Sequence, residues 1–187
     1  YILNTYKVLV LSLKKDIERR EHITSVLDKL GLKFEFFDAT SPEDLKGDYY
    51  TRKVVFADLD NNPKVNREAV IATFVSHLQL LKTVFNSKQN TLVLEDDLIP
   101  VRDFNFDDVD FTSFDVMQLM SEVSCCCQFY NWKSAGDLIS YFSFNRPTQA
   151  FDWELHKLRS KFNIVTIDKP VFKQSSEFIS NLAPNGY

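Results

Sequence analysis

Apolar and polar positions in the first part of the chain alternate between strand-like and helix-like spacing. A short apolar run over 6–13 contains β-branched residues and predicts a buried strand. Apolar residues at helical spacing follow over 17–30, with Asp16 placed as an N-cap and Gly31 as a C-cap signal. A second strand is predicted over 32–37. The chain therefore opens as strand, helix and strand, the beginning of a βαβ unit.

The same alternation returns after an irregular segment. Residues 39–64 are rich in turn-forming residues and too long for an ordinary connection, which marks them as a candidate functional loop. A helical stripe then covers 67–85. The apolar run 91–94 predicts another buried strand, and it ends in the acidic sequence Glu95-Asp96-Asp97.

Beyond residue 100 the periodicity is weaker. We predict strands over 116–120, 138–144 and 164–167, and a helix over 152–162. With no repeat or linker in the sequence, the expected architecture is one α/β domain over 1–187, with a mostly parallel central sheet flanked by helices.

Composition narrows the class of protein. The 187 residues include 22 Lys and Arg against 26 Asp and Glu, a net charge of −4 that argues against nucleic acid as the main partner. The four glycines are too far apart for a phosphate-binding loop, and the three histidines lack zinc-site spacing. The cysteines are consecutive, which excludes a disulfide framework and favours a reducing compartment. We interpret Cys125–Cys127 as a partly buried strand or loop rather than a metal cluster.

The acidic end of the strand over 91–94 is the strongest chemical signal. Open α/β sheets bind ligands at the carboxyl ends of their strands. If the extended geometry continues, Glu95 and Asp97 project to the same side and form a hard-oxygen site for Mn²⁺ or Mg²⁺. The alternative is a solvated acidic turn.

Three stretches together resemble glycosyltransferase family 25, the lipooligosaccharide and collagen galactosyltransferase group. They are 8–20, a strand followed by a basic segment ending in paired Arg; 36–39, a strand ending in Asp-Ala; and Ser76-His77-Leu78 on a helix, followed by the Leu-Glu-Asp-Asp strand end. The resemblance implies a GT-A-like fold with a donor-binding half over about 1–100 and an acceptor half over about 101–187. It also implies inverting transfer of a sugar, typically galactose, from a UDP-sugar to a glycan acceptor such as lipooligosaccharide.

The resemblance assigns donor-site roles to several residues. Glu95 and Asp97 would hold Mn²⁺ or Mg²⁺ against the diphosphate, with Asp96 as a neighbour or a direct ligand. Arg19 and Arg20 would contact donor phosphates, or else belong to a solvated helix face. Gln174 would line the cleft.

The same resemblance places Asp152 as the base that deprotonates the acceptor hydroxyl; the alternative is a helix N-cap. His77 and Ser76 are candidates for the cleft. A core histidine with its hydrogen bonds satisfied is the alternative for His77.

One departure from the family supports a rival hypothesis. The family usually has Gly-Glu-x-Gly-Cys before its Ser-His, whereas this chain has Ala-Val-Ile-Ala-Thr over 69–73. A degenerate member that serves as a binding or scaffold module is therefore one alternative, and a nucleotide-sugar hydrolase is another. For an active transferase we expect a cytoplasmic location, with peripheral contact at the inner membrane face, because no apolar run approaches the roughly 20 residues of a membrane helix.

Overall fold

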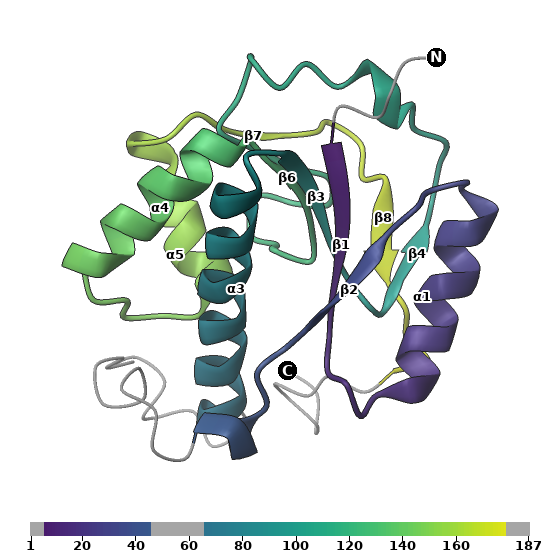
Figure 1. Ribbon diagram of the computed structural model, residues 1–187. Helices are drawn as coiled ribbons and strands as arrows, with labels where there is room; N and C mark the ends of the chain where they lie inside the picture. Colours follow the sequence, from purple (N-terminus) through teal and green to yellow (C-terminus); the bar gives the residue numbers. More distant parts are fainter. Residues whose placement is uncertain (1–5, 46–65, 179–187) are drawn as a thin grey trace.

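The computed structural model describes residues 6–45 and 66–178, which form a six-stranded sheet in the order β2-β1-β3-β6-β5-β7 (Figure 1). The strands are β1 (Tyr6–Ser12), β2 (Glu35–Asp38), β3 (Asn90–Glu95), β5 (Val116–Gln118), β6 (Cys127–Tyr130) and β7 (Ile164–Thr166). Strand β1 runs parallel to both β2 and β3, and β5 runs parallel to β7. Strand β6 is antiparallel to its neighbours β3 and β5. The predicted α/β fold with a mostly parallel sheet is confirmed.

Helices cover both faces of this sheet. They are α1 (Ile17–Lys29), α3 (Arg67–Ser87), α4 (Trp132–Phe144) and α5 (Phe151–Lys157), with 3₁₀ turns η1 (Pro42–Leu45), η3 (Phe106–Asp108) and η4 (Leu158–Ser160). Helices α3, α4 and α5 lie on one face, and α1 lies on the other (Figure 1). A small antiparallel ribbon of β4 (Leu98–Pro100) and β8 (Phe172–Gln174) lies on the α1 side.

The two faces of the sheet explain the continuous apolar pattern of β1. Val8 and Val10 pack into the cluster that contains α1, whereas Leu9 and Leu11 pack into the cluster that contains α3. All four side chains are buried. A strand covered on both faces needs apolar residues at successive positions rather than at alternate ones.

Two sequence predictions in the second half need correction. The strand predicted over 138–144 is wrong, because these residues form the second half of helix α4. Its buried positions Ala135, Leu138 and Phe142 recur at helical spacing, but the apolar window at its end is too short to distinguish a helix from a strand. The helix predicted over 152–162 is shorter. It corresponds to α5, which ends at Lys157, and η4 follows it.

Other expectations are met or lie outside the described chain. Gly31 has a φ of 68°, the left-handed conformation typical after a helix. Most of the candidate loop over 39–64 lies outside the described residues. None of the helices in the described ranges combines the length and the apolar character that crossing a bilayer requires.

The N-terminus of α4 provides a test of this corrected region. The Asn131 side chain accepts a hydrogen bond from the Lys133 amide at 3.0 Å and donates one to the Phe111 carbonyl at 2.9 Å. Asn131→Ala should lower the free energy of unfolding by about 1–2 kcal/mol, measured by urea denaturation. Asn131→Asp keeps the cap and should recover part of this loss. Equal stability of the alanine variant and the wild type would contradict the assignment.

Candidate active site

The carboxyl ends of three parallel strands meet at one edge of the sheet. In the strand register, Leu11 of β1 is opposite Glu95 of β3, and Ser12 of β1 is opposite Asp38 of β2. The connection from β1 to β2 leaves towards one side, while β3 pairs on the other side of β1. Ligands of open α/β sheets bind at such an edge, where neighbouring connections diverge.

The acidic sequence changes direction at this edge. Strand β3 ends at Glu95, and Asp96 and Asp97 form a turn that leads into β4. The extended geometry on which the same-side projection of Glu95 and Asp97 depended therefore stops at Glu95. Backbone hydrogen bonds fix the turn, since the Ser175 amide donates to the Asp97 carbonyl at 2.7 Å.

Arg19 binds both aspartates of the turn. Its Nε lies 2.7 Å from Asp96 Oδ1, and its Nη2 lies 2.6 Å from Asp97 Oδ2. The three side chains are only 13%, 7% and 8% exposed. Burial alone would lower the pKa of Arg19, but the two carboxylates outweigh it and raise the pKa. The alternative of a solvated helix face is therefore wrong for Arg19.

Asp97 remains incompletely neutralised. Burial, together with the charge of Glu95, raises its pKa to about 6 despite the opposing charge of Arg19. Its Oδ1 atom is buried and has no hydrogen-bond partner within the described residues. Gln174, whose Nε2 lies 3.4 Å from Oδ2, adds only a long hydrogen bond. An unpartnered carboxylate oxygen beside further acids fits a hard cation such as Mn²⁺ or Mg²⁺, while the roles of Glu95, Asp97 and Gln174 stay predictions.

Arg20 joins the ends of β1 and β2. Its Nη2 donates to Asp38 Oδ1 at 2.6 Å and to the Ser12 carbonyl at 3.0 Å, and its guanidinium lies over the Phe36 ring. These contacts contradict a freely solvated face for Arg20 as well. Contact of either arginine with donor phosphates stays a prediction.

The Ser76-His77 pair of α3 divides into two roles. Ser76 Oγ donates to the Ala72 carbonyl and accepts from the Thr40 amide at 2.8 Å, so it attaches the segment after β2 to α3. His77 is fully buried, and its ring stacks on Phe151 of α5 at 4.4 Å between centroids. Neither of its ring nitrogens has a hydrogen-bond partner among the described residues. His77 is therefore a core histidine, as in the alternative, but its hydrogen bonds are not satisfied among the described residues.

Asp152 lies close enough to His77 and Glu95 for their charges to act on it. The N-cap of α5 is Ala150, so the N-cap alternative for Asp152 is wrong; its Oδ1 instead accepts from the Trp153 amide at 2.8 Å. Burial raises the pKa of Asp152, the charge of Glu95 raises it further, and His77 opposes this effect. The fold thus brings together His77 of α3, Glu95 of β3 and Asp152 of α5. The catalytic role of Asp152 stays a prediction.

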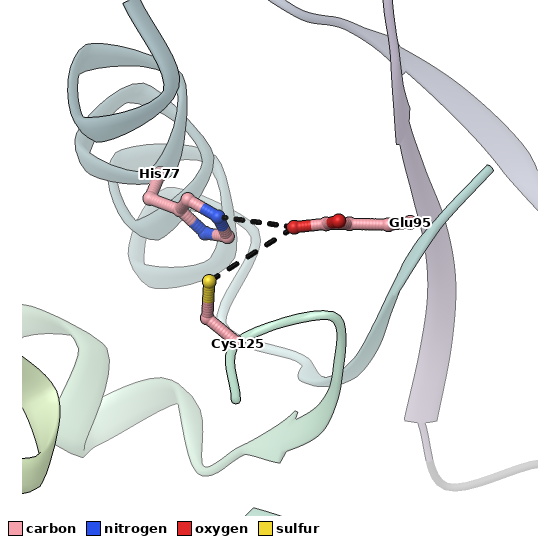
Figure 2. Close-up of side chains that lie close together, drawn as sticks. All are labelled: His77, Glu95 and Cys125. Carbon is pink, nitrogen blue, oxygen red and sulfur yellow. Dashed lines mark hydrogen bonds and ion pairs between the residues drawn. The ribbon is translucent and has the colours of Figure 1, made fainter. Parts of the chain in front are cut away.

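Cys125 lies beside this site, and the sequence did not indicate its position. Its Sγ lies 3.9 Å from Glu95 Oε1, and His77 Nε2 lies 3.8 Å from the same oxygen (Figure 2). The pairing of β6 with β3 creates this proximity, because the Glu95 amide donates to the Cys126 carbonyl at 2.7 Å. No spacing rule within the sequence connects residues 77, 95 and 125.

The fold and the sequence now identify the class of protein and then the family. The described fold is similar to that of the apo-form glycosyltransferase GlyE of Streptococcus pneumoniae TIGR4, with a TM-score of 0.51 and 13% identity over 88% of this chain and 46% of that one. This likeness establishes a GT-A-like fold. The profile of glycosyltransferase family 25 (LPS biosynthesis protein) matches residues 5–126, about two thirds of the chain. The chain belongs to this family.

A curated relative agrees with the family. A protein described as a putative glycosyltransferase from Haemophilus influenzae is 33% identical over 91 residues, which are 48% of this chain and 31% of that protein. A glycosyltransferase involved in glycosylation of the major capsid of PBCV-1 is less similar in structure, with a TM-score of 0.46 and 11% identity over 87% of this chain and 81% of that one. The chain spans about a third of the length of the Haemophilus relative and less than half of that of GlyE.

The raised pKa of Asp97 predicts a pH dependence of stability. Because its pKa is about 6 in the folded state and about 3.9 in the unfolded state, the native state binds the proton more tightly. The contribution of Asp97 to the free energy of unfolding is fully present below about pH 4 and is lost as the pH rises to about 6. The unfolding free energy of the wild type minus that of Asp97→Asn should fall by about 1–3 kcal/mol over this interval.

Urea denaturation in metal-free buffer between pH 4 and pH 7 measures this difference. Asp103→Asn, at an exposed acid, gives the baseline for removing one carboxylate. A difference that rises with pH would contradict the prediction and would mean that the ion pair with Arg19 outweighs burial.

Proposed function

We propose that this chain carries the site of a metal-dependent inverting transferase that moves galactose from UDP-galactose to a glycan acceptor of the lipooligosaccharide type. The observation that carries this proposal is the set of three acids and Arg19 at the carboxyl edge of β1 and β3. Membership of a glycosyltransferase family supports the reaction type.

The donor binds at this edge of the sheet. Mn²⁺ or Mg²⁺, held by the carboxylates of Glu95 and Asp97, would neutralise charge that develops on the departing UDP. Asp96 completes the acidic site, and the guanidinium of Arg19 provides a charge-assisted contact with the diphosphate. Gln174 supports this arrangement because its exposed side chain lies next to Asp97.

Asp152 accepts the proton of the acceptor hydroxyl. Inversion requires one base on the side opposite the departing UDP. The raised pKa of Asp152 supports this role, since a carboxylate of higher pKa is a stronger base. Glu95 adjoins the acidic turn, and its negative charge also acts on Asp152.

The acceptor half begins after the acidic turn and includes α4 and α5. Phe144 and Trp153, which are 87% and 50% exposed, offer apolar surface for peripheral contact with a lipid-linked acceptor at the inner face of the cytoplasmic membrane.

A binding or scaffold module is the second candidate. Arg19 already pairs with both aspartates of the turn, a contact that a fold without a metal would also use. The residues that replace the family's Gly-Glu-x-Gly-Cys, 69–73, include four buried apolar side chains of α3 and therefore contribute to the core.

A thermal-shift titration with UDP separates the two candidates. Saturation at a hundred times the dissociation constant stabilises the native state by about 2.7 kcal/mol, or roughly 5–10 °C for a chain of this size. We expect this shift with UDP and Mn²⁺ together, and its loss with chelator or in Asp97→Asn. Asp103→Asn should behave like the wild type. An equal shift in chelator would contradict metal-dependent binding, and no shift under any condition would favour the scaffold.

Asp152→Asn tests the base separately. Transfer should slow by about 10²–10⁴-fold while the shift with UDP and Mn²⁺ is retained. The wild-type rate should increase with pH through an apparent pKa above the usual carboxyl range, because the pKa of Asp152 is raised. Asp137→Asn on α4, at an exposed acid, is the matched control. Full activity of Asp152→Asn would assign the base to another residue.

A further inference from the structure

Three side chains of different chemistry converge on one point beside the acidic turn. His77 comes from α3, Glu95 from the end of β3, and Cys125 from the segment before β6 (Figure 2). One ligand atom from each lies within 4.8 Å of the other two. Both the histidine and the cysteine approach the same oxygen, Glu95 Oε1, at 3.8 Å and 3.9 Å.

These separations are too long for strong hydrogen bonds but suit a bound cation. Tetrahedral Zn²⁺ has bonds of about 2.0–2.2 Å to nitrogen and oxygen and about 2.3 Å to sulfur, which place its ligand atoms about 3.3–3.6 Å apart. The observed distances between Glu95 and its two neighbours exceed this range by only about half an ångström or less.

His77 provides independent evidence for a missing partner. Its side chain is 0% exposed, yet neither Nδ1 nor Nε2 has a hydrogen-bond partner among the described residues. Leaving a buried polar group unpaired costs about 1–3 kcal/mol, so a native structure normally satisfies it. Stacking on Phe151 fixes the ring plane, and Figure 2 shows the imidazole facing Glu95.

The charges of the three side chains and the exposure of Glu95 to solvent are also consistent with cation binding. A neutral imidazole, a carboxylate and a thiolate together balance a divalent ion. Glu95 is 21% exposed and opens the cluster towards the edge of the sheet, while His77 and Cys125 are buried. The negative charge of Asp152 acts on the same group, since it contributes to the raised pKa of Cys125.

We propose that His77, Glu95 and Cys125 bind one zinc-class divalent cation, with a fourth position left for water. The combination of sulfur, nitrogen and carboxylate oxygen favours Zn²⁺ or Co²⁺ over Mn²⁺ and Mg²⁺. Within the described chain no fourth side chain joins the three, which is typical of an open rather than a closed structural site. The ion uses Glu95 Oε1, so the other carboxylate oxygen stays available to the donor site.

Titration of the metal-free protein with Co²⁺ tests the site directly. We expect one equivalent to produce the intense visible bands of tetrahedral cobalt and a thiolate-to-cobalt charge-transfer band, both removed by equimolar Zn²⁺. Cys125→Ser should abolish the charge-transfer band and weaken Zn²⁺ binding roughly a hundredfold or more, because even losses outside the ligand set cost 10–100-fold. Cys126→Ser, at the neighbouring thiol, should retain both.

Other results would overturn the site. The charge-transfer band could be absent, or it could be lost in Cys126→Ser and kept in Cys125→Ser. Zn²⁺ binding that no variant changes would be adventitious. Because His77 is fully buried, its replacement risks unfolding; Cys125→Ser is nearly isosteric, and its thermal unfolding without metal checks the fold.

The outcome is independent of the proposed function. Cys125→Ser should leave the thermal shift with UDP and Mn²⁺ intact, so failure of the cobalt experiment would not affect the donor site. Conversely, a cobalt band in a protein that does not bind UDP would leave the zinc-class site standing without the transferase.

Discussion

Three consecutive carboxylates at the end of a buried strand must be compensated, and much of the local structure follows from that constraint. Removing a carboxylate from water without a partner costs several kcal/mol. Arg19 meets part of this requirement because it pairs with both aspartates, and it reaches them because α1 begins directly after β1, on the same edge of the sheet. Glu95 Oε1 instead lies near the thiol of Cys125 and the imidazole of His77. The carboxyl end of the sheet thus has one part paired with Arg19 and another part around Glu95.

The reversed strand β6 determines what surrounds Glu95. Because β6 runs antiparallel to β3, the start of one strand lies beside the end of the other, and Cys125 approaches Glu95. The chain bends at Cys126 before β6 begins, so Cys125 packs into the core under α3, whereas Cys126 and Cys127 pack into the core under α1. The three consecutive cysteines therefore belong to two different parts of the core.

The sequence predicted those helices and strands whose apolar spacing is set within a single segment. Strands β1 and β3, helices α1 and α3, and the acidic end of β3 all follow from spacing within a single segment. Helix α4 was missed because its last apolar residues fit both periods. The partners of Arg19 were not predictable, since the turn at Asp96 and the return of the chain along β8 decide them. Likewise, the meeting of His77 with Cys125 depends on which strand pairs with β3, and no local pattern encodes that choice.

The stacking of Phe151 on His77 connects the hydrophobic core directly to the residues around Glu95. Phe151 is 2% exposed, it also packs against Phe74 of α3, and the next residue along the chain is Asp152. A shift in this aromatic layer would also displace the backbone of Asp152, since a planar peptide bond joins the two residues. The packing of buried aromatic rings therefore constrains the position of His77 and of the first turn of α5. A change in the shape of this layer would alter the surroundings of Glu95 without replacing any residue of the acidic turn.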